Sequence, residues 1–271
     1  MKRITGALVV MSLFACQPKS ATRASTNPAK EESGQGAKDG DEDQDGSEQD
    51  DDDKIVTPEP VKDVMSKGPN SRVICKAPDG INTEPRSMPD MIKLINALPK
   101  PVTVACVVDA LKGPFRVNAT SSAFSAQPAY SEDAPRIFLF YEPLYISIVP
   151  TGMGGDMIEF SIQTGPEESV KGELAFPVKD TITEDAAYEH IKFETANATV
   201  CGSCHSGERP AGDGFPANAF ISSFLRTMDV YDVSAKQIEK SAKRCQTEVL
   251  PECKVLEALT SKGALIQTNF K

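Results

Sequence analysis

The sequence has no tryptophan and only two histidines among its 271 residues, and no apolar run after the first fifteen residues is long enough to cross a membrane. A spanning helix needs about 20 apolar residues, so we expect no later span. The common hydrolase, nucleotide-binding and zinc-protease patterns (G-x-S-x-G, the Walker loop and H-E-x-x-H) are also missing. A net charge of −10 argues against a nucleic-acid partner.

The first fifteen residues consist of a basic start and a short apolar stretch, Ile4–Ala15. The stretch has the form of a secretory signal, residues 1–15. It ends in Leu13-Phe14-Ala15-Cys16, which resembles the lipobox of bacterial lipoproteins. The resemblance implies a lipid on the Cys16 thiol, cleavage before it, and acyl chains such as palmitate holding the chain on the bilayer. By the same resemblance, Gln17 implies an outer-membrane lipoprotein, on the periplasmic face or the cell surface. The alternative is an ordinary signal peptide in which Cys16 is incidental.

Residues 16–68 are predicted to be a disordered acidic tether. Between residues 17 and 60 there are thirteen acidic and five basic residues, and large apolar side chains are scarce. Such a segment buries too little apolar surface to offset the entropy of ordering. Asp41–Gly46, followed by Asp52, matches part of a calcium loop, but neither flank has the periodicity of a helix. We interpret that match as a coincidence of an acidic run.

Residues 69–198 are predicted to be a β-rich domain, because short β-branched and alternating segments recur there. One helix interrupts it, capped by Ser87 and ended by Pro99. The predicted strands are Val102–Val108, Arg136–Tyr141, Pro143–Val149, Met157–Ile162 and Val170–Val178, with the turn Gly152–Asp156 joining two of them.

Residues 199–271 are predicted to be a small helical tail. An apolar face over Phe220–Met228, a capping box beginning at Ser234, and a segment over Glu252–Ser261 indicate three helices. The expected fold is therefore α+β, with a sandwich-like β-rich domain followed by a helical region that has a C-x-x-C-H motif at its start.

Six of the seven cysteines remain after the lipidated one, and an even number in an exported chain indicates disulfides. Cys75 and Cys106 flank the first predicted helix, and Cys245 and Cys253 flank a short turn. Pairing within each couple is the simplest connectivity.

The last pair lies in Cys201-Gly202-Ser203-Cys204-His205, which resembles the attachment sequence of c-type cytochromes. Two cysteines with two residues between them lie about one helical turn from each other, so both thiols can add to the vinyl groups of one porphyrin, and the next histidine binds the iron. The resemblance implies haem c on Cys201 and Cys204, with His205 as an iron ligand. A haemless Cys201–Cys204 disulfide, a metal site with His205, and an ordinary surface histidine remain as alternatives.

Two side chains are candidates for a second iron ligand. Met228 lies about 23 residues after the motif, but it also completes an apolar stripe. His190 is the other histidine and falls in a possible helical turn. If neither binds, the iron has an open position for a small molecule.

These features indicate an electron carrier or binding protein more than an enzyme: a membrane-anchored monohaem c-type redox lipoprotein with a redox partner protein. The alternative is a disulfide-stapled structural or binding lipoprotein without haem. The chain as a whole also resembles uncharacterised envelope lipoproteins of Gram-negative bacteria, a group that adds no activity.

Overall fold

The computed structural model describes residues 75–194 and 196–270. The predicted signal peptide, Cys16 and the acidic tether with its calcium-loop-like stretch lie outside the described residues. All described residues fall in one compact unit.

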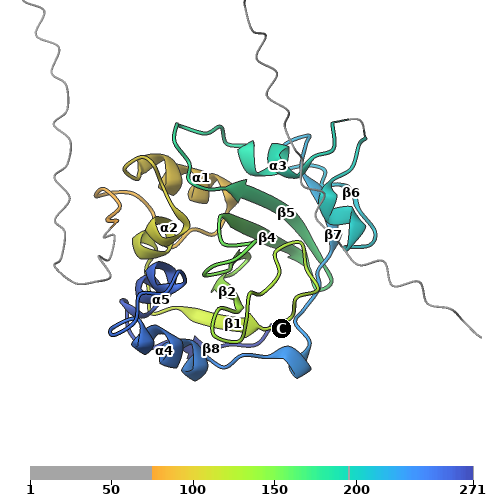
Figure 1. Ribbon diagram of the computed structural model, residues 1–271. Coiled ribbons are helices and arrows are strands. Elements are labelled where there is room, and N and C mark those ends of the chain that lie inside the picture. Colours follow the sequence, from red (N-terminus) through yellow and green to blue (C-terminus); the bar gives the residue numbers. More distant parts are fainter. Residues whose placement is uncertain (1–74, 195, 271) are drawn as a thin grey trace, which may run out of the picture. The chain divides into compact units, whose positions relative to one another are not determined.

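A single eight-stranded sheet forms the centre of the fold, in the order β6-β7-β5-β4-β3-β2-β1-β8 (Figure 1). Neighbouring strands are antiparallel except β1 and β8, which run parallel. The strands are β1 (Arg116–Thr120), β2 (Arg136–Tyr141), β3 (Leu144–Ile148), β4 (Met157–Gly165), β5 (Glu168–Ala175), β6 (Arg209–Pro210), β7 (Phe220–Ser223) and β8 (Ile266–Gln267). The helices are α1 (Met88–Ala97), α2 (Val104–Ala110), α3 (Ala186–Ile191), α4 (Ala235–Arg244) and α5 (Cys253–Thr260), with the short 3-10 helices η1 (Val200–Ser203) and η2 (Asp229–Tyr231).

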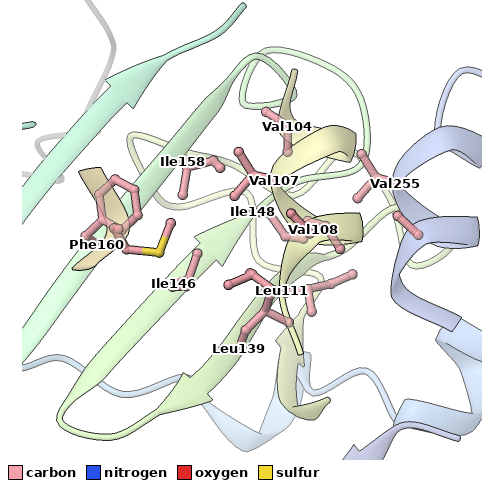
Figure 2. Close-up of a cluster of buried hydrophobic side chains, with 14 of the residues drawn as sticks. Val104, Val107, Val108, Leu111, Leu139, Ile146, Ile148, Ile158, Phe160 and Val255 are labelled. Atoms are coloured by element: carbon pink, nitrogen blue, oxygen red, sulfur yellow. The ribbon is translucent and has the colours of Figure 1, made fainter. Parts of the chain in front are cut away.

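One face of the sheet is apolar and is covered by helices. Ile146 on β3 lies opposite Phe160 on β4, and Phe160 lies opposite Gly172 on β5. Figure 2 shows the valines of α2 packed over this face, with Val255 of α5 beside them. On β5, a Cβ added to Gly172 would lie 2.6 Å from Met88 Cε of α1, so the glycine permits the helix to approach the strand closely.

The other face of the sheet is polar and aromatic, because successive residues of a strand point to opposite sides. The alternation predicted in β3 is confirmed: Leu144, Ile146 and Ile148 are in the main core, and the residues between them point away from the helices. Two cross-strand rows result on this face, Tyr145–Ser161–Lys171 and Ser147–Glu159–Glu173. This face supports the candidate site.

The caps predicted from the sequence begin their helices. The Ser87 side chain accepts a hydrogen bond from Asp90 N at the start of α1, and the Ser234 side chain accepts one from Gln237 N at the start of α4. α4 also ends in two basic residues, which complement the negative end of its dipole.

The first predicted strand, Val102–Val108, is wrong: most of it forms helix α2. Thr103 caps this helix, its side-chain oxygen accepting from Cys106 N. Every residue of α2 is buried, so the segment is apolar all round and has no period that separates a helix from a buried strand. Only Val102 keeps a strand-like contact, a single bridge to Val178.

The helix predicted over Phe220–Met228 is also wrong, because residues 220–223 form β7 and pair with β5. The apolar residues of this stretch serve two surfaces: Ile221 belongs to the main core, and Phe224 to a separate aromatic cluster on the other face. The predicted sandwich also differs from the structure. The described strands form one sheet, with helices in place of a second sheet, and β6, β7 and β8 come from beyond residue 199.

Both predicted disulfides are confirmed. Cys75–Cys106 ties the chain before α1 to α2, and Cys245–Cys253 joins α4 to α5. All four cysteines are buried. The fold is thus α+β, with a β-rich part and two buried covalent cross-links.

Candidate functional site

The C-x-x-C-H motif forms a tight turn beside the polar face of the sheet. Residues 200–203 are the 3-10 helix η1, which the Thr199 side chain caps by accepting a hydrogen bond from Cys201 N. The Cys201 carbonyl then accepts from Cys204 N at 3.1 Å and from His205 N at 2.8 Å. The motif is therefore wound as a single turn, as its spacing predicts.

A carboxylate on the far side of the turn fixes its start. Glu208 Oε1 accepts from Thr199 N at 2.7 Å, and Glu208 Oε2 accepts from the Thr199 hydroxyl at 2.5 Å. Thr199 is only 1% exposed. The carboxylate also lies against the backbone of Gly202, where a Cβ would be 2.7 Å from Oε1. We call this Thr199–Glu208 pair the clasp of the motif.

His205 is held in one tautomer by a backbone carbonyl. Its Nδ1 lies 2.8 Å from the carbonyl oxygen of Ser223, at the end of β7. A carbonyl oxygen only accepts, so Nδ1 carries the proton and Nε2 carries the lone pair. Burial, together with the positive charges of Lys171 and Arg136, lowers the pKa of His205 to about 4, and the Ser223 bond opposes this. At neutral pH the imidazole is uncharged, and Nε2 carries a lone pair.

Cys201 and His205 line the same pocket, which opens over the polar face of the sheet. The pocket encloses about 570 Å³ when its open mouth is counted, and about 70 Å³ of this is interior space. Arg136, Glu159, Lys171 and Glu173 give it a charged floor, and Phe138, Tyr145, Phe224, Leu225 and Phe270 give it an aromatic and apolar wall.

The charged floor is internally paired. Arg136 Nη2 lies 2.5 Å from Glu159 Oε2, and its Nε donates to the Ser147 hydroxyl. Burial raises the pKa of Glu159, and the neighbouring Arg136 guanidinium opposes the rise. Lys171 is 8% exposed, and burial lowers its pKa to about 8. Ser161, on the same floor, has a buried hydroxyl without a hydrogen-bond partner in the structure.

The aromatic wall is a compact cluster of rings from distant parts of the chain. Phe270, near the end of the sequence, has its ring centroid 5.2 Å from that of Phe138 and 5.5 Å from that of Tyr145. Phe224 completes the cluster at 5.2 Å from Tyr145. Such separations are typical of favourable ring pairs.

The predicted site residues are only partly brought together. Cys201 lines the pocket with a free thiol, so it is not bonded to Cys204, and burial raises its pKa to about 12. Cys204 is exposed and does not line the pocket.

Neither candidate for a second iron ligand lines the pocket. His190 Nδ1 is 3.0 Å from Glu173 Oε1, which engages the imidazole at the other end of the charged floor. Met228 is 56% exposed, immediately before η2. Neither side chain therefore shares the pocket with His205.

Several residues of the site were not predicted from the sequence: Arg136, Lys171, Thr199, Glu208, Ser223 and Phe270. Thr199 and Glu208 flank the motif and their residue types hint at a cap. The others reach the pocket through strand pairing and the path of the C-terminus.

Of the donor set that haem c would need, the pocket supplies only part, because Cys204 lies outside it. A thiol and a neutral imidazole with a free Nε2 face one pocket, and an aromatic wall and two cations suit a flat apolar ring with anionic substituents. The interior space of about 70 Å³ is far below the roughly 300–1,000 Å³ of small-molecule sites. The enclosed part of the pocket is therefore too small for a porphyrin.

No protein-family model, curated protein or solved structure matches the chain. Among residues 75–194 and 196–270, no helix has the length and apolar character to traverse a bilayer. The same residues contain no group of three or more His, Cys, Asp or Glu side chains arranged to hold a metal ion.

Proposed function

We propose that the protein is a monohaem c-type redox protein of the cell envelope, anchored by a lipid on Cys16. Cys201 and Cys204 would hold the porphyrin through thioether bonds, and His205 Nε2 would bind the iron. When bound, haem supplies a one-electron couple. The supporting observation is the hydrogen bond from His205 Nδ1 to the Ser223 carbonyl, since metal-binding histidines are generally oriented by such a bond from their other ring nitrogen.

The chain's own residues would prepare the site in three ways. The clasp winds the motif so that Cys201 and His205 face one pocket. The Ser223 carbonyl fixes the imidazole as the Nδ1–H tautomer. Arg136 and Lys171 place positive charge on the floor, where it favours the reduced, less positive state of a bound iron. The aromatic wall excludes water from one side.

The coordination opposite His205 decides whether the protein only carries electrons or also binds a small molecule. Because neither His190 nor Met228 lines the pocket, the geometry favours an open position. A ferrous spectrum of five-coordinate, high-spin type would support this arrangement, and a six-coordinate, low-spin spectrum would show that a side chain moves in to bind.

The test is expression of the full chain in a bacterial host with working haem-attachment machinery, followed by an intact mass and an optical spectrum. We expect a mass increase of one haem and a Soret band that survives denaturation. A Cys201→Ser, Cys204→Ser double variant should lose both. A Cys16→Ser variant should keep the haem but lose lipid labelling and membrane association.

A colourless wild-type protein without added mass would refute the haem proposal. The chain would then fit the alternative, a structural or binding lipoprotein stabilised by the Cys75–Cys106 and Cys245–Cys253 disulfides. The two buried bridges support that alternative.

A further inference from the structure

The carbonyl oxygen of Ser223 accepts two hydrogen bonds from the candidate site. His205 Nδ1 lies 2.8 Å away and Lys171 Nζ lies 3.1 Å away. The two donors come from different elements: Lys171 is on β5, which pairs with β7 through Glu168 opposite Ser223, and His205 follows η1. A carbonyl oxygen has two lone pairs and can accept both bonds. Each donor draws electron density from the same carbonyl group, so each bond weakens the other.

Lys171 has few other partners, which fixes the position of its ammonium group. Its Nζ also donates to the Ser169 hydroxyl on the same strand, and the Ser169 carbonyl lies farther off, at 3.5 Å. A buried ammonium is costly unless its protons are bonded, so the group is held against Ser223 by the need to satisfy them. The charged groups around it are Glu159 on β4 and Glu208 beyond the motif, with the Cys201 thiol also nearby.

The cation affects the imidazole through the shared carbonyl. An ammonium on one lone pair of Ser223 withdraws electron density from the carbonyl, which weakens the bond that Nδ1–H makes to it. A weaker bond makes the imidazole a poorer electron donor at Nε2.

We propose that Lys171 is a positioning residue for His205, which reduces the donor strength of the imidazole by sharing the Ser223 carbonyl. The role for a metal-bound His205 rests on the proposed function, whereas the shared carbonyl does not. A Lys171→Met substitution keeps the aliphatic stem and removes the charge and the donor. Lys171→Arg keeps the charge and is the matched control.

The experiment has two arms. In haem-free protein labelled with ¹⁵N-histidine at pH 7, Lys171→Met should move the Nδ1-bound proton of His205 downfield, because the Ser223 carbonyl is no longer shared. In haem-loaded protein the same variant should lower the midpoint potential and raise the iron–histidine stretching frequency, and Lys171→Arg should stay close to wild type. The His190 resonance is the internal control.

A second variant guards against loss of folding in Lys171→Met. Ser169→Ala removes the competing acceptor of Lys171, so the ammonium should bond more strongly to Ser223 and shift every readout in the opposite direction. Unchanged proton shifts and potentials in both variants would overturn the proposal. A preparation without haem refutes the proposed function alone, because the proton shift of His205 still tests Lys171.

Discussion

Replacing Gly202 with alanine tests whether the clasp fixes the C-x-x-C-H turn. The new Cβ would lie 2.7 Å from Glu208 Oε1 and 2.9 Å from Glu208 Cδ. Both distances are below van der Waals contact, so the carboxylate must move. Its place is set by the two bonds from Thr199, at 2.7 and 2.5 Å, which a shift of the carboxylate breaks or lengthens.

The cost follows from the burial of Thr199. At 1% exposure, its amide and hydroxyl gain little from water once the carboxylate leaves. A buried polar group without a partner costs about 1–3 kcal/mol. Replacing glycine by alanine recovers about 0.4–1 kcal/mol from the unfolded chain. We expect a net destabilisation of about 1–2 kcal/mol, which lowers the melting temperature of a domain of this size by roughly 2–8 °C.

Thermal melting followed by circular dichroism, with the disulfides intact, measures the effect. Gly165→Ala is the matched control, because no atom lies within 4 Å of its Cβ position. In a Glu208→Ala background the clash partner is gone, so Gly202→Ala should then cost nothing. The reasoning is refuted if Gly202→Ala and Gly165→Ala have the same melting temperature. It is also refuted if Gly202→Ala destabilises the protein equally with and without Glu208.

Removing the Cys75–Cys106 bridge, which has a sequence separation of 31, should lower the free energy of unfolding by about 3.7 kcal/mol in the loop-entropy account. Removing Cys245–Cys253, which has a separation of 8, should lower it by about 2.5 kcal/mol. Urea unfolding of the two variants measures both losses, and the opposite order would contradict this account. Glu173 raises the pKa of His190, so their pairing should stabilise the fold fully below about pH 6.5 and lose its effect as the pH rises through the raised value. The stability advantage of wild type over His190→Gln should therefore shrink from pH 5.5 to 8.5, and a constant difference would exclude the pairing. Phe160→Ala should cost about 3–5 kcal/mol because its ring is 1% exposed, while Phe124→Ala, at 79% exposure, should stay within about 0.5 kcal/mol.

Local signals in the sequence were sufficient for much of the fold. The strand β2 has the predicted bounds, Arg136–Tyr141, and the alternation in β3 identified its core face. The serine caps of α1 and α4 begin those helices as expected. In each case the deciding interaction lies within a few residues of the element.

The secondary structure was predicted wrongly for two kinds of segment. One is buried on all sides, and the other contributes side chains to two separate hydrophobic clusters. α2 is buried all round, so Val102–Val108 gave no contrast between faces. β7 and the residues after it contribute Ile221 to one core and Phe224 to another, and their spacing imitates a helical stripe. Neither case can be resolved without knowing which elements pack around the segment.

The candidate site divides in the same way. Cys201 and His205 were found from a five-residue motif, and the structure brings both to one pocket. Lys171 and Ser223 contact the motif only because β5 pairs with β7, about 50 residues farther along the chain. Interactions of that range depend on the sheet order, which the local pattern does not contain.

The short edge strands of the sheet affect how readily the protein can associate with other chains through its backbone. Both outermost strands are only two residues long, β6 at one edge and β8 at the other. Pro210 in β6 has no amide hydrogen to offer a neighbour. An incoming chain therefore finds almost no free backbone ladder to extend, so the sheet is protected against edge-to-edge pairing with other chains.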